Sequence, residues 1–178
     1  MSEIDLFRLM ASYNAWMNGR LYDAAAGLEP TVLHAERGAF FGSIFGTLNH
    51  LVVADTIWLK RFATSRNAAA LAPLAEIPAP TSLREEVAPD LAELRTRRDL
   101  LDRLTSAWVA DLTDADLAEP LAYRRVNGTE ERKTLGPLVM HFFNHQTHHR
   151  GQATTLFMQA GIDVGVTDLL ALIPSAAT

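Results

Sequence analysis

The chain has 178 residues, 48% of them apolar and 21% charged, with a net charge of -5, which is the composition of one ordinary globular domain over residues 1–178. It contains no cysteine, so disulfides, thiolate zinc sites, iron–sulfur clusters and a cysteine nucleophile are excluded, and any metal must bind to nitrogen and oxygen. The acidic balance disfavours nucleic-acid binding, and neither a secretory leader nor an apolar run of membrane length is found, so we expect a cytoplasmic protein with no membrane contact.

Two amphipathic helices are predicted in the first part of the chain. Apolar residues recur at intervals of three and four over Leu6–Ala24, which predicts a helix that ends before Gly27. A second helix is predicted over Ser43–Phe62, where the apolar residues cover a broad arc. We expect Asn49 on the solvent side of this helix. His50 lies on the shoulder of the apolar arc, where its ring can turn inward.

The middle of the chain predicts a loop followed by a third helix. Residues 63–82 are rich in alanine and proline and have no strong period, so they are interpreted as a connecting loop. Ser82 and Glu85 have the spacing of a capping box, which predicts that the third helix starts near Ser82 and runs to Leu112. Pro89 indicates a kink or a delayed first turn near the start of this helix.

A hairpin and a fourth helix are predicted next. Asn127-Gly128, inside the segment Leu121–Thr134, favours a two-residue hairpin turn. Pro137 fits the first turn of a helix that runs to about Gln159, with Gly161 as its cap.

The predicted elements define the fold class. Four helices in one small domain favour an all-α fold, an up-down four-helix bundle with a small β-hairpin insertion before the last long helix. The apolar tail, Val164–Ile173, is expected to pack back onto the bundle as a short segment.

Four of the six histidines lie between positions 141 and 149, on the fourth predicted helix. The pairs His141 with His145 and His145 with His149 are four residues apart, and His148 is three residues after His145, so His145 belongs to every possible pair. A catalytic metal usually takes three protein ligands, so the third must come from elsewhere, and His50 is the best candidate. The ordinary alternative is a set of polar rings on a partly exposed face, but so many ring nitrogens on an inward-packing helix favour a metal.

Two other metal-site patterns are absent. The zincin helix needs His-Glu-x-x-His, but Gln146 follows His145, and an amide cannot act as a general base. Di-iron bundles use Glu-x-x-His, and no glutamate in this chain has a histidine three residues later. Metalloprotease and di-iron chemistry are therefore excluded.

Several segments together form a recognisable pattern: Tyr13–Tyr22, Gly42–Leu51, Ala54–Asp55, Trp58, Arg61–Phe62 and His145–Gln152. This pattern closely resembles the DinB family of metalloenzymes, over nearly the whole length of the chain. The ending His-His-Arg-Gly-Gln at 148–152 is its most specific part.

The resemblance implies a four-helix bundle, often dimeric, in which three histidines hold one divalent ion. By this likeness the ligands match His50, in its Leu-Asn-His context, and the pair His145 and His149. Related members look like thiol S-transferases that use low-molecular-weight thiols, and one branch contains a thiol-dependent maleylpyruvate isomerase.

We therefore expect a metal-dependent enzyme, a transferase of the thiol S-transferase type or a hydrolase, with one zinc or nickel ion and an open coordination position. We also expect a small-molecule substrate, such as a low-molecular-weight thiol, and a homodimer. The sequence does not identify catalytic residues. The alternatives are a non-catalytic metal-binding stress-response or sensing protein that acts as a dimer, and a plain structural bundle.

Five further residues are candidates for supporting roles. Asp55, Asn144 and Gln152 can orient the ligand rings, and Arg61 and Arg150 can hold an anionic substrate. The ordinary role of each is packing or a surface ion pair. Trp16 and Trp58 are expected to belong to the core.

Overall fold

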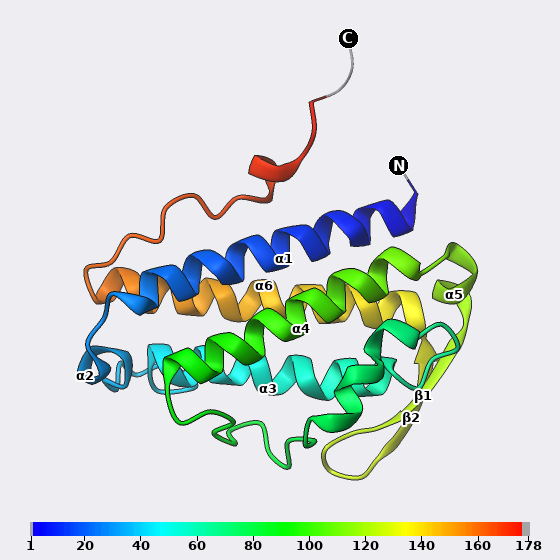
Figure 1. Cartoon of the computed structure of the whole chain (residues 1–178), viewed down its shortest axis with the longest axis horizontal. Coiled ribbons are helices and arrows are strands. Elements are labelled where there is room, and N and C mark those ends of the chain that lie inside the picture. Colours follow the sequence, from blue (N-terminus) through cyan, green and yellow to red (C-terminus); the bar gives the residue numbers. More distant parts are fainter. Residues whose placement is uncertain (1, 176–178) are drawn as a thin grey trace.

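The computed structural model describes residues 2–175 and is built mainly of helices (Figure 1). In chain order the elements are α1 (Glu3–Ala26), α2 (Pro30–Leu33), α3 (Ile44–Phe62), the 3-10 helix η1 (Ala69–Glu76), α4 (Leu91–Asp111), α5 (Asp114–Ala118), β1 (Pro120–Arg124), β2 (Glu130–Thr134), α6 (Leu135–Gln159) and the 3-10 helix η2 (Leu169–Leu172). The all-α class, the four long helices and the hairpin before the last of them are confirmed.

The four long helices pack so that α1 and α3 each contact both α4 and α6 (Figure 1). Helices α3 and α6 are antiparallel, because His50 lies beside His149 while Trp58 lies beside His141. Helices α3 and α4 are parallel, because Phe62 near the end of α3 stacks on Trp108 near the end of α4. The directions are therefore up, down, down and up, and the connection between α3 and α4 crosses back along the bundle.

This crossover, residues 63–90, is more structured than a plain loop. Residues 63–82 do connect two helices, as expected, but part of them forms η1, which buries Leu71 and Leu74 against the bundle and was not predicted. This segment consists mainly of alanine and leucine around Pro73, so polar and apolar positions do not alternate with a helical period, and the burial cannot be predicted from the pattern.

The start of the third helix near Ser82 is also wrong. Helix α4 begins at Leu91, after an N-cap at Asp90 whose side chain accepts a hydrogen bond from the backbone N–H of Glu93. A helix from Ser82 would place Pro89 in its second turn, where proline lacks the N–H that the helix needs. Glu85 instead accepts hydrogen bonds from the backbone N–H and hydroxyl of Thr81.

The hairpin forms, but its turn is longer than two residues. Strands β1 and β2 pair antiparallel from Pro120 with Thr134 to Arg124 with Glu130. The backbone N–H of Arg125 still donates to Thr129, so the loop holds three residues, 126–128. Gly128 has a φ of 86°, the left-handed conformation that a three-residue hairpin loop requires, which explains how Asn-Gly signals a turn of a different length.

Helix α6 ends as predicted, and the tail packs only in part. The helix stops at Gln159, Gly161 has a φ of 79°, and the N–H of Ile162 donates to the carbonyl of Phe157 in a Schellman arrangement. In the tail Val164 is buried, but Leu170 is 75% exposed. The hydroxyl of Tyr13 donates to the carbonyl of Thr167, and η2 contacts α1, so the expectation that the tail packs back onto the bundle is confirmed in part.

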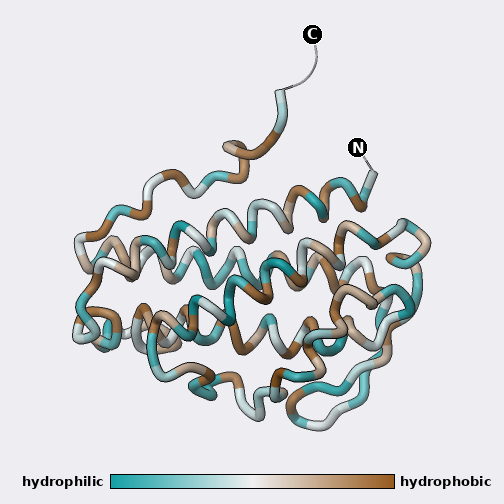
Figure 2. Tube along the Cα trace, viewed as in Figure 1, coloured by the Kyte–Doolittle hydropathy of each residue, from teal (hydrophilic) through white to brown (hydrophobic). Residues whose placement is uncertain are grey.

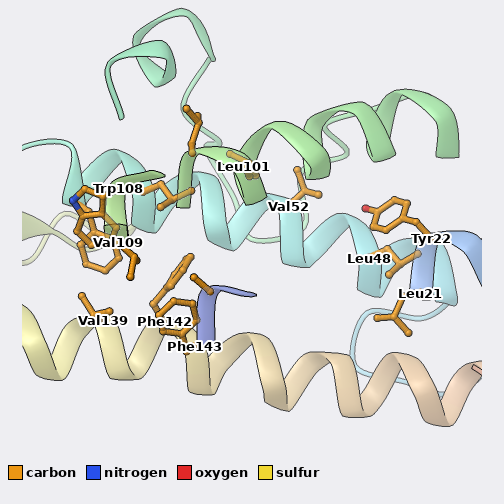
Figure 3. Close-up of a cluster of buried hydrophobic side chains, with 14 of the residues drawn as sticks. Leu21, Tyr22, Leu48, Val52, Leu101, Trp108, Val109, Val139, Phe142 and Phe143 are labelled. Atoms are coloured by element: carbon orange, nitrogen blue, oxygen red, sulfur yellow. The ribbon is translucent and has the colours of Figure 1, made fainter. Parts of the chain in front are cut away.

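The core lies between the four long helices. Side chains from all four meet there, as the labelled Leu21, Leu48, Leu101 and Phe142 show (Figure 3). Hydrophilic and hydrophobic residues are interspersed along each helix, as amphipathic helices require (Figure 2). Among residues 2–175, no helix is both long and apolar enough to cross a membrane.

A buried polar network interrupts this core and joins the four long helices. The Asp55 carboxylate on α3 accepts from Arg98 Nη1 on α4 at 2.5 Å and from Gln146 Nε2 on α6 at 2.8 Å. Arg98 Nη2 lies 2.9 Å from Asp102, which accepts hydrogen bonds from α1. The members of this network are Asn14, Asn18, Asp55, Arg98, Asp102, Gln146 and Arg150.

Candidate metal centre

Three imidazoles converge between α3 and α6. His50 comes from α3, and His145 and His149 come from α6. One ring nitrogen of each lies within 4.8 Å of those of the other two. The ring centroids of His145 and His149 are 4.4 Å apart, and that of His50 is 5.4 Å from His145 and 4.5 Å from His149. The structure thus brings together the three histidines selected from the sequence.

Local structure explains why these rings meet. His145 and His149 are four residues apart on one helix, so their side chains lie one turn apart on the same face. Their neighbour Gln146 donates a hydrogen bond to Asp55 on α3, which fixes α6 against the helix that carries His50.

The crossover and the loop before α3 fix the ring of His50. Its Nδ1 lies 3.1 Å from the carbonyl oxygen of Leu83, an acceptor, so Nδ1 carries the proton and donates. Phe41 stacks on the ring with centroids 3.7 Å apart and planes 15° apart. The next residue, Asn49, donates to the Glu85 carbonyl and accepts from the backbone N–H of Val87, so it is buried rather than on the solvent side.

The other nitrogen of His50 is an unpaired polar atom. Within residues 2–175, the buried Nε2 has no hydrogen-bond partner, although the side chain is only 3% exposed. Because Nδ1 holds the proton, Nε2 offers a lone pair toward His145 and His149. A buried nitrogen lone pair without a partner is costly, and a metal ion is one group that would satisfy it.

The ring of His149 is oriented in the same way by a side chain. Its Nδ1 lies 2.7 Å from Oε1 of Gln152, one turn later on α6. An amide oxygen only accepts, so the Nδ1–H donates and the Nε2 lone pair remains free. Gln152 thus has the ring-orienting position expected from the sequence.

All three rings are held in the neutral form. Burial, with a smaller effect of the neighbouring rings, lowers the pKa of His50 to about 4 and that of His145 to about 3, although the hydrogen bond to Leu83 raises the pKa of His50. Burial also lowers the pKa of His149, against the opposing effect of its bond to Gln152. Neutral imidazole is the form that donates to a metal, so this group could hold one divalent ion.

The remaining histidines of the cluster do not join this group. His141 is exposed, with its ring centroid 5.1 Å from Trp58 and 6.1 Å from His145. His148 is also exposed, and its Nε2 lies 3.2 Å from Nε2 of Gln152. The geometry thus groups His145 and His149, rather than His141 or His148, with His50.

Three supporting roles expected from the sequence are not found among the described residues. Asp55 binds Arg98 and Gln146 rather than a ligand ring. Arg150 is 2% exposed and donates to Asn14, so it is not accessible to a substrate. Asn144 is exposed, with no ring contact among the described residues.

Two contributors to the site were missed from the sequence. Phe41 lies in the loop before α3, where no periodic pattern points to it, and the acceptor for His50 is a backbone carbonyl, that of Leu83. The spacing of the histidines contains no information about either.

Two comparisons with known proteins point to the DinB family. A model of the DinB family matches residues 1–177. The chain is 30% identical over 157 residues to Protein DinB of Bacillus subtilis (strain 168), and the match covers 88% of this chain and 87% of that protein. No solved structure shows a significant match.

Proposed function

The chain belongs to the DinB family, and from this premise we propose that it is a metal-dependent enzyme of the thiol S-transferase type, with one zinc or nickel ion on His50, His145 and His149. Zinc and nickel are chosen because both accept imidazole ligands, and the chain has no thiolate to offer. The substrate is a small molecule, and the thiol is a low-molecular-weight cosubstrate.

One observation carries the metal part of this proposal. The buried Nε2 of His50 has no partner among the described residues and lies with the ring nitrogens of His145 and His149 in one group. A purely structural histidine would have both ring nitrogens paired or one in water.

The proposed chemistry needs few groups from the protein. When bound, a divalent ion would lower the pKa of a thiol so that its thiolate is available at neutral pH. Three protein ligands leave a position for that thiol, and His145 is only partly buried, so the group is reachable from solvent. Phe41 covers the ring of His50, and Gln152 holds the ring of His149, so the residues of the site fix the ligands and shield one side.

The proposal includes a location and an oligomeric state. We propose that the protein acts in the cytoplasm, where low-molecular-weight thiols stay reduced, and that it forms a homodimer.

Cobalt substitution tests the proposal. In a cobalt-loaded protein, a small thiol or azide should change the visible spectrum saturably without releasing the ion, and the His149→Ala variant should lose this response. His148→Ala is the matched control, because this exposed neighbour lies outside the group, and it should respond as the wild type does. Thiol transfer to an electrophile such as 1-chloro-2,4-dinitrobenzene should then require the metal.

The result also separates the alternatives. A protein that binds cobalt but whose spectrum ignores every thiol and anion would overturn the enzyme proposal in favour of a metal-binding or sensing module. A protein that binds no divalent ion would leave a structural bundle.

A further inference from the structure

Arg61, near the end of α3, packs against two aromatic rings that touch each other. Its guanidinium carbon lies 4.6 Å from the ring centroid of Trp58 and 5.0 Å from that of Tyr123 on β1. The two rings are themselves 5.5 Å apart. Aromatic faces hold a guanidinium without using its N–H groups, so its hydrogen-bonding edge stays available.

This cation has no acidic partner. Within residues 2–175, no carboxylate oxygen lies within 4.0 Å of Arg61, whereas the fully buried Arg98 has two such partners, Asp55 and Asp102. Arg61 is partly buried, and this burial lowers its pKa. A partly desolvated guanidinium without an anion costs free energy, as does the unpaired Nε2 of His50, and a bound partner would reduce that cost.

The surroundings of Arg61 carry an excess of positive charge. Arg125 and Lys133, both from the hairpin region, share the single carboxylate of Glu131, at 2.6 and 3.8 Å. The field of Arg61 and Lys133 reaches His141, where burial first and these two charges next lower the pKa of the ring. Although the chain as a whole has a net charge of -5, the region around Arg61, Arg125 and Lys133 is locally positive and would attract an anion.

A row of rings connects this corner to the three imidazoles. The centroid of Trp58 is 5.1 Å from His141, which is 6.1 Å from His145. Trp58, His141 and His145 are all at least partly exposed. Arg61 follows His50 by eleven residues, which is about 16 Å along the helix axis, and its guanidinium packs on the ring of Trp58. A small peptide-sized molecule would therefore span the distance from Arg61 to the histidine group.

We propose that Arg61, packed against Trp58 and Tyr123, binds the carboxylate of a low-molecular-weight thiol whose sulfur reaches the three-histidine group. This inference rests on the proposed function and narrows its substrate class to elongated thiols with a carboxylate about 10 Å from the sulfur, roughly three residues of extended chain. The guanidinium edge gives two parallel hydrogen bonds to a carboxylate, and the aromatic rings exclude water around them.

Calorimetric titration of the zinc-loaded protein tests this role, with two probes that share the thiol and the peptide backbone but differ at the carboxylates. Glutathione carries free carboxylates, and glutathione diethyl ester does not. Arg61→Gln should weaken glutathione binding about tenfold or more and leave the affinity for the ester unchanged, because a charge-assisted pair is lost only in the first case. Arg61→Lys should recover part of the affinity, since it restores the charge without the planar fork.

Arg20→Gln is the matched control. Arg20 also lies over an indole, with its guanidinium carbon 5.1 Å from the ring of Trp16, but it donates to the carbonyl of Val164 and is not near the histidines. This variant should bind glutathione within about twofold of the wild type. Equal glutathione affinities for the wild type and Arg61→Gln, or no binding of glutathione at millimolar concentration, would overturn the inference.

A third probe separates this inference from the proposed function. S-methylglutathione keeps both carboxylates but its blocked sulfur has no thiol proton to lose. If its binding depends on Arg61 and is unchanged by His145→Ala, the carboxylate subsite is supported whether or not a thiol binds the metal. If glutathione binding depends on His145 and not on Arg61, the thiol site is supported and the subsite is refuted.

Discussion

The amide oxygen of Gln152 lies 2.7 Å from Nδ1 of His149, one helical turn before it on α6. The same amide places its nitrogen 3.2 Å from Nε2 of His148, so one side chain is held between two neighbouring rings. The amide oxygen accepts a hydrogen bond from the Nδ1–H of His149. The lone pair of the other ring nitrogen therefore stays free in the group with His50 and His145.

Replacement of Gln152 by alanine should weaken zinc binding about 10- to 100-fold, because the ring of His149 loses the acceptor that fixes its tautomer and orientation. Competition with a chromophoric chelator measures the affinity. Asn144→Ala is the control, since Asn144 is exposed on the same helix, and its affinity should stay at the wild-type value. An equal loss in both variants would show that Gln152 has no specific role.

Replacement of His145 by alanine should abolish stoichiometric metal binding, because this ring supplies one of the three nitrogens that lie within 4.8 Å of one another. Elemental analysis of the purified protein should give about one divalent ion per chain for the wild type and for His148→Ala, and almost none for His145→Ala. Retention of the ion by His145→Ala would place the site elsewhere, with His141 the first residue to test.

The metal-free protein should lose stability on acidification between about pH 6.5 and pH 4. In the unfolded chain His50 binds a proton below about pH 6.5, whereas burial keeps its folded pKa at about 4, so the unfolded state binds more protons in this window. The stability that the neutral His50 ring contributes is complete above about pH 6.5 and is lost as the pH falls to about 4.

Thermal unfolding of the apo-protein across this window measures the effect, at about 2–4 °C for each kcal/mol lost. His50→Asn removes the shifted ring, so the Tm of this variant should fall less steeply with acid than that of the wild type. Parallel curves for the two proteins would contradict the assignment of a depressed pKa to His50.

Replacement of Arg98 by methionine should destabilise the protein by about 3–5 kcal/mol, because the carboxylates of Asp55 and Asp102 would remain buried without their cation. Urea unfolding of the apo-protein measures the change. The neighbouring Arg97→Met is the control, since Arg97 forms only an exposed pair with Glu93, and it should lose less than about 1 kcal/mol. A wild-type midpoint for Arg98→Met would show that the buried pair adds nothing to stability.

The histidine pair on α6 follows from the sequence for a local reason. The interval of four residues between His145 and His149 is a property of one helix, and an N-terminal proline and a terminal glycine mark the ends of that helix. The same logic failed for α4, where Ser82 and Glu85 have capping-box spacing but a proline in the way, so Asp90 caps the helix instead.

The path of the chain between α3 and α4 could not be predicted. Residues 63–90 have no period, yet they cross back along the bundle and bring the carbonyl of Leu83 to His50. A backbone carbonyl is present at every residue, so no sequence pattern distinguishes the one that becomes an acceptor.

The sequence by itself determined the family, the helices with a clear period and the residue types able to bind a metal, since each is encoded in local spacing. Tertiary structure alone decided which polar residues are buried. Arg150 and Arg61 both have the chemistry to hold an anion, but Arg150 packs inside the bundle with Asn14, while Arg61 is only partly buried and packs against Trp58 and Tyr123. Burial depends on how elements distant in the chain pack together, which short-range periodicity does not contain.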